Sequence, residues 1–249
     1  MRFVSENIDL ANRRAIATRQ GGEVLGEQVG CVESSERTKP AIIDRGFRRH
    51  HAPYITDRRE SSLMTTLSPL DTQPSLQTPR LVLRPMTLAD AAAVQRLAGD
   101  IEVASTTLLI PHPYPDGAAE AWIATHAGRY QRGEAIDFAI EEKQCGQLVG
   151  ASGLVLAPPH ERAELGYWIG RDYWGRGYCT EAGRAVVEFA FRVLNLHRVQ
   201  ASHFTRNIAS GRVLQKIGLT HEGSCRGYVK KWDRFEDCEL YAILTNDPS

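Results

Sequence analysis

Two closely spaced glycines are the residues that most clearly indicate chemistry. Gly175 and Gly177 lie in the segment ELGYWIGRDYWGRGYCTEAGRAVVEF, after a stretch that predicts a strand and before one that predicts a helix. The first amides of a helix have no partner within the helix, and they carry partial positive charge that attracts phosphate. Glycine lets such amides converge on an anion because no side chain intervenes. We therefore predict an anion-binding loop, with an ordinary tight turn as the alternative.

The spacing alone does not identify the phosphate compound. The sequence contains no G-x-x-x-x-G-K-[ST] run of the kind found in P-loops. A dinucleotide-binding G-x-G-x-x-G run fails because Thr180 stands where the third glycine is needed. Glu181 falls in the first turn of the predicted helix, where it suits the helix dipole, and we expect it to be a cap and not a ligand.

The elements that must position this loop alternate between strand and helix patterns. Period-two or continuous apolar stretches predict strands at 80–86, 135–142, 147–156, 162–170, 197–204, 219–229 and 238–245. Helical periodicity is found at 87–99, 116–133, 180–194 and 207–218. This order predicts an α/β (α+β) fold, with a mixed twisted sheet of about six to seven strands and helices on both faces.

Local signals support several of these boundaries. Thr87 and Asp90 have the spacing of a capping box, and Asn207 is placed as an N-cap. Gly99 and Gly218 each stand where a predicted helix should end. The long helix carries one apolar stripe, which we expect to be buried: Ala182, Ala185, Val186, Phe189, Ala190 and Val193.

Composition excludes several classes of protein. Thirty basic residues balance thirty acidic ones, so no overall field draws the chain to nucleic acid or to an anionic membrane. No apolar run approaches the roughly 18 residues of a membrane span, and the charged N-terminus does not resemble a signal peptide. The five cysteines include no C-x-x-C pair, and His50 and His51 lie far from any of them. We expect a reducing, cytoplasmic location and no bound metal.

The first part of the chain differs from the rest. Residues 1–75 lack sustained periodicity, and 65–79 are rich in Ser, Thr, Pro and Gln, which is typical of a linker. We expect residues 1–75 to be a disordered extension and linker, with translation from Met64 as one hypothesis for the natural start. Residues 78–248 then form one domain of ordinary size.

Four segments in order resemble one known family. The run W-G-R-G-Y-C-T-E-A, after a strand ending in Y-W-I, resembles the acyl-CoA-binding segment of the GNAT acetyltransferase superfamily, and more closely its RimJ/RimL-like branch of ribosomal-protein N-terminal acetyltransferases. The runs T-P-R-L-V-L-R-P-M, N-I-A-S-G-R-V-L-Q-K-I-G-L-T-H-E-G and D-C-E-L-Y-A-I-L agree as well. Together they cover residues 78–248.

The resemblance implies where acetyl-CoA binds. A V-shaped cleft is expected between the fourth and fifth strands, 162–170 and 197–204, with the pantetheine arm along one of them. Asn207 would contact the pantetheine, which is compatible with its capping role, and Ser210 would face the sulfur unless it is an ordinary first-turn residue. The remaining residues expected to contact the cofactor are Tyr167, Trp168, Ile169, Trp174, Gly175, Arg176, Gly177, Tyr178, Cys179 and Thr180.

The resemblance also implies a reaction, the direct attack of a neutral primary amine on the thioester in a ternary complex. Glu164 is our candidate to accept the proton through water, with an ion pair to Arg162 as the alternative. His203 and Tyr167 are further candidates that packing would equally explain. Many family members carry a tyrosine as proton donor at the position of Leu214, so here Ser210 is expected to donate a hydrogen bond to the developing thiolate.

Cys179 and the acceptor site remain open at the level of sequence. A helix N-terminus could lower the pKa of Cys179, but a packing role is favoured over an acetyl-cysteine intermediate. Residues 226–237 either line the acceptor side or form a solvated hairpin, and acceptors in the branch include protein N-termini, antibiotics, polyamines and amino acids. An α-amine with a pKa of about 8 is about a tenth neutral at pH 7 and needs the weakest base. A monomer or homodimer is expected; the alternatives are a non-catalytic acyl-CoA sensor and a nucleotide-binding protein.

Overall fold

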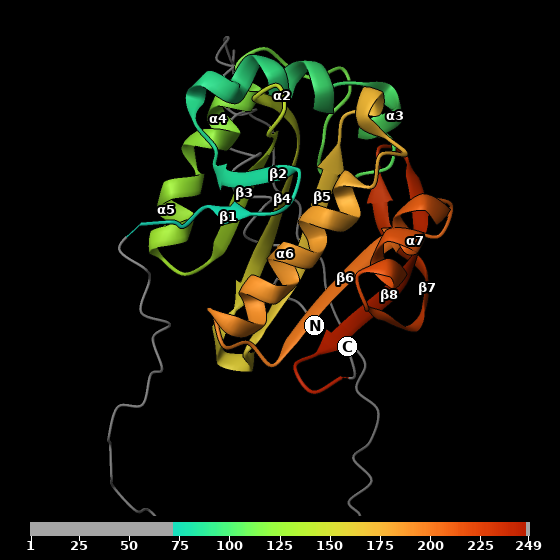
Figure 1. Ribbon diagram of the computed structural model, residues 1–249. Coiled ribbons are helices and arrows are strands. Elements are labelled where there is room, and N and C mark those ends of the chain that lie inside the picture. The colour runs from blue at the N-terminus through green and yellow to red at the C-terminus, as the bar shows by residue number, and fades with distance from the viewer. Residues whose placement is uncertain (1–71, 248–249) are drawn as a thin grey trace, which may run out of the picture. The chain divides into compact units, whose positions relative to one another are not determined.

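An eight-stranded sheet forms the centre of the fold in the computed structural model, which describes residues 72–247. The strand order is β1-β2-β3-β4-β5-β6-β8-β7, and every neighbouring pair is antiparallel except β5 and β6 (Figure 1). The strands are β1 (Leu76–Gln77), β2 (Leu81–Pro85), β3 (Ala135–Glu142), β4 (Gln147–Ala157), β5 (Arg162–Ile169), β6 (Arg198–Phe204), β7 (Thr220–Lys231) and β8 (Arg234–Leu244). The predicted fold class is confirmed. The added strand is β1, which at two residues is too short to show alternation.

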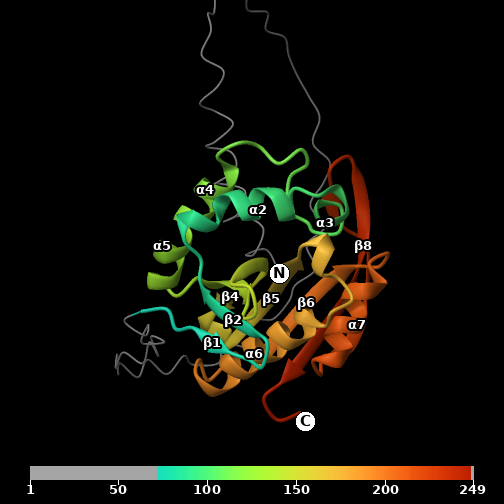
Figure 2. The ribbon, with the colours of Figure 1, turned by 45° about the horizontal axis from the view of Figure 1, so that its top comes forward.

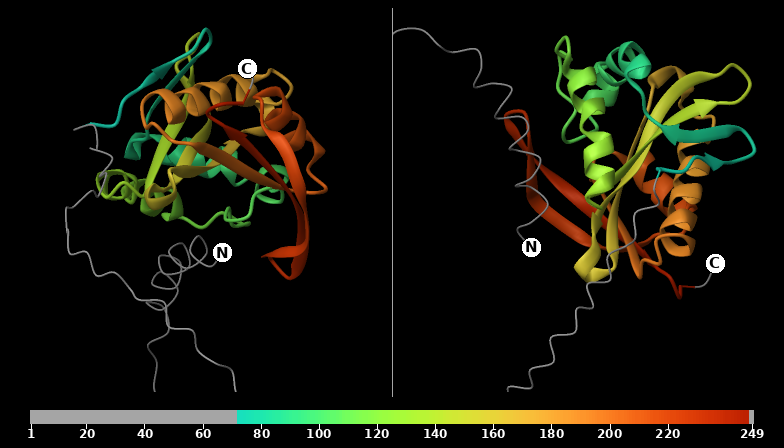
Figure 3. Two further views of the ribbon diagram at one scale, coloured as in Figure 1. Left: turned by 90° about the horizontal axis from the view of Figure 1, so that it is seen from below. Right: turned by 90° about the vertical axis from the view of Figure 1, so that its left-hand side faces the viewer.

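Helices cover both faces of the sheet, as predicted. In the right-hand view of Figure 3, α6 lies on one side of the strands and α4 and α5 lie on the other. The helices are α2 (Ala91–Ala98), α3 (Ile101–Ala104), α4 (Ala118–Ala124), α5 (His126–Gln131), α6 (Tyr178–Arg192) and α7 (Ile208–Lys216), with short 3-10 turns at Leu88–Asp90, Pro158–His160 and Arg171–Tyr173. No helix within residues 72–247 has the length and apolar character needed to cross a membrane.

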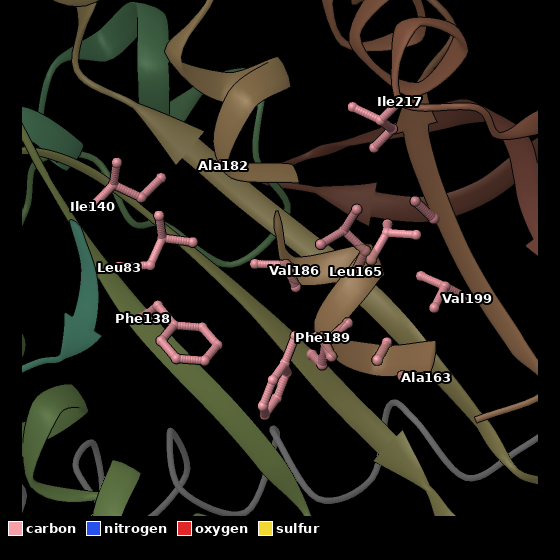
Figure 4. Close-up of a cluster of buried hydrophobic side chains, with 14 of the residues drawn as sticks. Leu83, Phe138, Ile140, Ala163, Leu165, Ala182, Val186, Phe189, Val199 and Ile217 are labelled. Carbon is pink, nitrogen blue, oxygen red and sulfur yellow. The ribbon is translucent and has the colours of Figure 1, made fainter. Parts of the chain in front are cut away.

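The larger core lies between the sheet and α6. Strands β2 to β6 contribute side chains that are almost fully buried, and α6 covers them with Ala182, Val186 and Phe189 (Figure 4). The rings of Phe138 and Phe189 meet edge to face with centroids 5.8 Å apart. A second cluster on the opposite face joins β3 and β4 to α2 and α4. Alternate residues of one strand thus serve two cores.

The capping signals around α2 are confirmed. Thr87 and Asp90 form the predicted capping box, and Asp90 also accepts two hydrogen bonds from Arg84 at 2.8 and 2.9 Å. The helix ends at Gly99 as expected. These contacts fix the entry of α2 above the upper ends of the strands, where it comes forward in Figure 2.

Two helix predictions were wrong in detail. The stretch 116–133 is divided into α4 and α5 at Thr125, whose hydroxyl donates to the carbonyl of Trp122 at 2.7 Å. Such side-chain bonds compete with the helical backbone. Val193 was expected on the buried stripe of α6, but the helix ends at Arg192 and Val193 is 46% exposed.

The expectations for the first part of the chain fall outside the described residues. They concern the disordered extension, the start at Met64, Cys31 and the pair His50 and His51. Within residues 72–247, no group of three or more His, Cys, Asp and Glu side chains is arranged to hold a metal ion.

One buried side chain makes the stability of this fold depend on pH. His126, at the start of α5, is 5% exposed and packs edge to face on Trp122 with ring centroids 4.5 Å apart. Neither ring nitrogen has a hydrogen-bond partner among the described residues. Burial lowers the pKa of His126, because the charged imidazolium would lose its hydration.

Replacing His126 with leucine is expected to reduce the loss of stability in acid. Below about pH 6.5 the unfolded chain protonates this imidazole, whereas the folded protein with its lowered pKa does not. The stabilisation is therefore complete above the unfolded pKa and is lost as pH falls toward the folded one, by at most about 1.4 kcal/mol per pH unit. Urea unfolding at about pH 7.5 and about pH 5.5 measures the free energy of unfolding. An equal acid loss in wild type and variant would contradict the assignment.

Candidate functional site

The parallel strands β5 and β6 part from each other along their length. Only three residue pairs join them, Arg162 with Arg198, Ala163 with Val199 and Glu164 with Gln200, although β5 continues to Ile169 and β6 to Phe204 (Figure 1). Each strand is paired on its other side, β5 with β4 and β6 with β8. Antiparallel pairing engages alternate residues, so the remaining N–H and C=O groups of β5 point toward the opening. The predicted opening between these two strands is confirmed.

The two-glycine loop begins α6 at the wide end of this opening. Gly175 and Gly177 have φ of 76° and 78°, which is the left-handed conformation that glycine adopts without strain. Residues 174–177 are exposed, so the bend is not closed inside the core. No side chain caps α6, and none of the amides from Gly175 to Thr180 donates to another described residue. This arrangement can bind an anion through backbone N–H groups alone.

Glu181 does not cap its own helix, contrary to expectation. Its carboxylate instead accepts hydrogen bonds from Thr78 Oγ1 at 2.6 Å, from the Arg80 amide at 2.8 Å and from Arg80 Nε at 2.7 Å. Burial opposes ionisation, but these hydrogen bonds lower the pKa of Glu181. The partners come from residues about one hundred positions away and could not be read from local spacing.

Arg80 is a residue near the loop that the sequence reasoning did not identify. Its Nη1 donates to the Arg176 carbonyl at 2.9 Å, and its guanidinium lies 4.8 Å from the centre of the Tyr178 ring. The alternating pattern of residues 80–86 showed that Arg80 and Leu81 face opposite sides of a strand. It did not show that Arg80 contacts the start of α6. The chain thus places a guanidinium, paired with Glu181, next to the backbone donors of the loop.

The other predicted loop residues have identifiable local partners. Trp174 donates from Nε1 to the Ile169 carbonyl at 2.7 Å, which links the loop to the end of β5. The Arg176 guanidinium donates to the Asp172 carbonyl at 3.0 Å, and the Tyr178 phenol donates to Glu142. These contacts hold the loop beside the opening while the loop amides remain free.

Cys179 is a packing residue. It lies in the first turn of α6 and packs against the core. Burial raises the pKa of its thiol to about 12. The possible lowering by the helix N-terminus is not found, because removing a thiolate from water disfavours ionisation. The favoured packing role is consistent with this position.

A hydroxyl pair bridges the opening between β5 and α7. The Tyr167 hydroxyl lies 2.8 Å from Ser210 Oγ and donates to the Ser210 carbonyl at 3.3 Å. Asn207 caps α7 by accepting from the Ser210 amide at 3.2 Å, as predicted. Burial raises the pKa of Tyr167, so its phenol keeps its proton. This contact joins β5 to α7. The sequence had suggested separate roles for Tyr167 and Ser210 and gave no sign of a contact between them.

Leu214 and His203 belong to the interior. Leu214 is 0% exposed within the core, so this position of α7 faces away from the opening. His203 is 9% exposed, its Nδ1 lies 2.8 Å from the Phe204 carbonyl, and a Cβ added at Gly211 would lie 2.7 Å from its Nε2. The packing interpretation of His203 fits this environment.

Glu164 lies at the last β5–β6 residue pair, on the face opposite α6. Its neighbours Ala163 and Leu165 are buried beneath α6, and alternation turns Glu164 to the other side. Burial raises the pKa of Glu164, and the Gln200 side chain hydrogen-bonds to it. Arg162 donates to Gln200 at 3.5 Å, and the ion pairs of the described residues do not include Arg162 with Glu164. The carboxylate therefore takes up a proton more readily than an ordinary glutamate does.

The end of the β7–β8 hairpin stands on the same side as Glu164. Figure 3 shows this hairpin projecting from the sheet on the side of α4 and α5. Lys231 of β7 is 3% exposed and donates to the carbonyls of Leu108 and Ile110 at 3.2 and 2.6 Å; burial lowers its pKa to about 8. Most of residues 226–237 are exposed, as expected for a solvated hairpin, and Lys231 and Glu236 are the buried exceptions. Burial and the charge of Glu164 raise the pKa of Tyr228.

Comparison with known proteins agrees with this geometry. The sequence model described as "Acetyltransferase (GNAT) domain" matches residues 80–220. The relative named "Uncharacterized N-acetyltransferase YoaA", from Bacillus subtilis (strain 168), is 36% identical over 172 residues, which are 69% of this chain and 97% of that protein. The "[Ribosomal protein uS5]-alanine N-acetyltransferase" of Escherichia coli (strain K12) is 28% identical over 138 residues, 55% of this chain and 71% of its own.

Solved structures show the same fold. The structure titled "Mycobacterium smegmatis RimJ in complex with CoA-disulfide" has a TM-score of 0.62 and 25% identity, and covers 72% of this chain and 88% of that chain. An acetyltransferase of the GNAT family from Bacillus anthracis has a TM-score of 0.63 and 23% identity, over 70% of this chain and 100% of its own. The chain therefore belongs to the GNAT acetyltransferase family and is an acetyl-CoA-dependent N-acetyltransferase.

Proposed function

We propose that this enzyme acetylates a protein N-terminal α-amine or a small primary amine by direct attack in a ternary complex. The observation that carries the proposal is the position of free loop amides beside the unpaired edge of β5. The branch of the family includes acceptors of both kinds, and the relative from Escherichia coli is named for an alanine of a ribosomal protein. An α-amine has a pKa of about 8, so its neutral fraction at pH 7 is far larger than that of lysine.

The residues present fit acetyl-CoA, which supplies an activated acetyl thioester. The amides of Gly175 to Thr180, together with Arg176, would hold the diphosphate, with Trp174 and Tyr178 flanking it. Backbone groups of Tyr167, Trp168 and Ile169 would pair with the pantetheine amides as an added strand does, and Asn207 would contact the same arm. Cys179 and Thr180 would contribute their backbone amides to binding of the diphosphate.

Two side chains of the chain handle the proton and the developing negative charge. Glu164, whose pKa is raised by burial, accepts the ammonium proton through water. Ser210 donates a hydrogen bond to the thiolate as it forms, and Tyr167 holds the serine hydroxyl in place at 2.8 Å. Positioning of the two reactants supplies the rest of the rate enhancement.

The same proposal includes the location, the oligomeric state and the domain bounds of the chain. We place the enzyme in the cytoplasm as a monomer or homodimer, with residues 78–248 as the acetyltransferase domain and residues 1–75 as an extension. The odd cysteine count and balanced charge support this context.

An amine panel tests the activity itself. Purified protein with acetyl-CoA and α-amino peptides, polyamines, amino acids and aminoglycosides is assayed with a thiol reagent. Amine-dependent release of CoA is expected. Tight CoA binding without turnover on any amine would instead support a non-catalytic acyl-CoA sensor, and stabilisation by ATP or NAD but not by CoA would support a nucleotide-binding protein.

Gly175→Ala is expected to weaken CoA binding by about tenfold, because alanine at positive φ costs roughly 1 kcal/mol and displaces the loop amides. Gly146→Ala is the matched control: Gly146 has φ of 67° in the β3–β4 turn, and a Cβ there meets nothing within 4 Å, as at Gly175. Both variants should lose similar stability, and isothermal titration with CoA separates them. Equal CoA affinities in the two variants would contradict the loop assignment.

Glu164→Gln is expected to lower kcat by roughly 100-fold or more while CoA affinity stays the same. The raised pKa of Glu164 places its protonation at higher pH than for an ordinary glutamate, so wild-type activity falls as the solution becomes acidic and this limb disappears in the variant. Rate profiles against pH measure it. Glu188→Gln, which removes a surface carboxylate paired with Arg192, is the control and should retain the wild-type profile.

Ser210→Ala is expected to lower kcat by roughly 100-fold, and Tyr167→Phe by less, because only Ser210 contacts the sulfur. The double variant should be little slower than Ser210→Ala, since the tyrosine acts through the serine. Steady-state kinetics of the four proteins give the coupling energy. Strictly additive effects would show that the two hydroxyls act independently.

A further inference from the structure

Two glycines lie side by side on the sheet face opposite α6, and only one of them is required by packing. Gly153 of β4 and Gly166 of β5 are register partners. A Cβ added at Gly153 would lie 2.6 Å from the Ile136 carbonyl oxygen, closer than real Cβ atoms approach. A Cβ added at Gly166 would meet nothing within 4 Å, and its backbone is not among those with positive φ. Neither sterics nor conformation requires glycine at position 166.

The open space at Gly166 lies beside the reacting groups. Alternation along β5 puts Gly166 on the same face as Glu164 and Trp168, about 7 Å from each along the strand. The β5–β6 pairing ends at Glu164, so Gly166 is the first position of this face next to the opening. On the other side of the same strand, Tyr167 contacts Ser210. Gly166 is exposed, whereas the flanking Glu164 and Trp168 are half-buried.

The chemistry places the acceptor across this glycine. Under the proposed function, on which this inference rests, the amine nitrogen lies between the Glu164 carboxylate and the thioester held near Ser210. On this face of β5, Gly166 is the first residue after Glu164 in the direction of the thioester. A side chain there would project into the path of the acceptor, next to the carbon that bears the amine.

We infer that Gly166 is a specificity-determining residue whose missing side chain leaves room for the substituent on the acceptor's amine-bearing carbon. The enzyme thereby takes α-substituted amines, such as an N-terminal alanine, as well as unsubstituted ones. Trp168, two residues further along the same face of β5, gives this space a partly apolar border, which suits a small hydrocarbon substituent.

The test uses the full-length enzyme and two peptides that differ only in an N-terminal glycine or alanine. Gly166→Val should lower kcat/KM for the alanine peptide by roughly 10–200-fold more than for the glycine peptide, which is the range for a misfit of one or two carbons. Gly166→Ala should show the same order with a smaller ratio. The affinity for CoA and the Tm should stay at or above wild-type values, because valine is favoured in strands.

A second readout keeps the outcome independent of turnover. Binding of each peptide to the enzyme–CoA complex is measured by calorimetry for wild type and Gly166→Val. A preferential loss of the alanine peptide supports the inference even if the wild type fails to acetylate any amine, a result that would overturn the proposed function alone. Equal effects on both peptides, or no effect, would overturn the role of Gly166. A lower Tm in Gly166→Ala would do so as well, since it would show that packing requires the glycine.

Discussion

The end of hydrogen bonding between β5 and β6 is the constraint on which the rest of the site depends. A parallel pair that stops after three residue pairs leaves backbone donors and acceptors unpaired, and a buried unpaired group costs roughly 1–3 kcal/mol. The fold tolerates this edge because each strand is secured on its outer side, β5 by eight pairs to β4 and β6 by seven pairs to β8. The unpaired groups remain open to solvent or to an extended ligand, which is how a sheet interior becomes a binding site for a strand-like arm.

The same strand separates two kinds of chemistry. Residues of β5 that face α6 are apolar or, at Tyr167, protonated at neutral pH, and they adjoin helix N-termini that favour anions. Residues on the opposite face include Glu164, whose carboxylate suits a cationic amine and then its proton. Under the proposed function, period-two alternation would place the anionic donor and the cationic acceptor on opposite sides of one backbone, and the reactants would meet where β5 has no neighbouring strand.

Regular elements and their ends were largely predictable from sequence, because their determinants are local. The alternation of Leu81 and Leu83, the capping box at Thr87 and the cap at Asn207 all act within a few residues. The loop glycines were recognised for the same reason. What sequence did not provide were partners distant in the chain: Glu181 with Arg80, Tyr167 with Ser210, and Lys231 with the carbonyls of Leu108 and Ile110. Burial also reversed a local argument at Cys179, where desolvation outweighed the helix dipole.

The bonds of Glu181 to Thr78 and Arg80 connect the start of the described fold directly to the loop at the head of α6. A force on the chain at Thr78 is therefore transmitted to the first turn of α6 through the Glu181 carboxylate and through the bond from Arg80 to the Arg176 carbonyl. A fusion partner or tag placed immediately before this threonine is thus coupled mechanically to the loop at the head of α6. Placement of such attachments beyond Leu244 acts instead on a strand whose neighbours are β6 and β7, remote in connectivity from that loop.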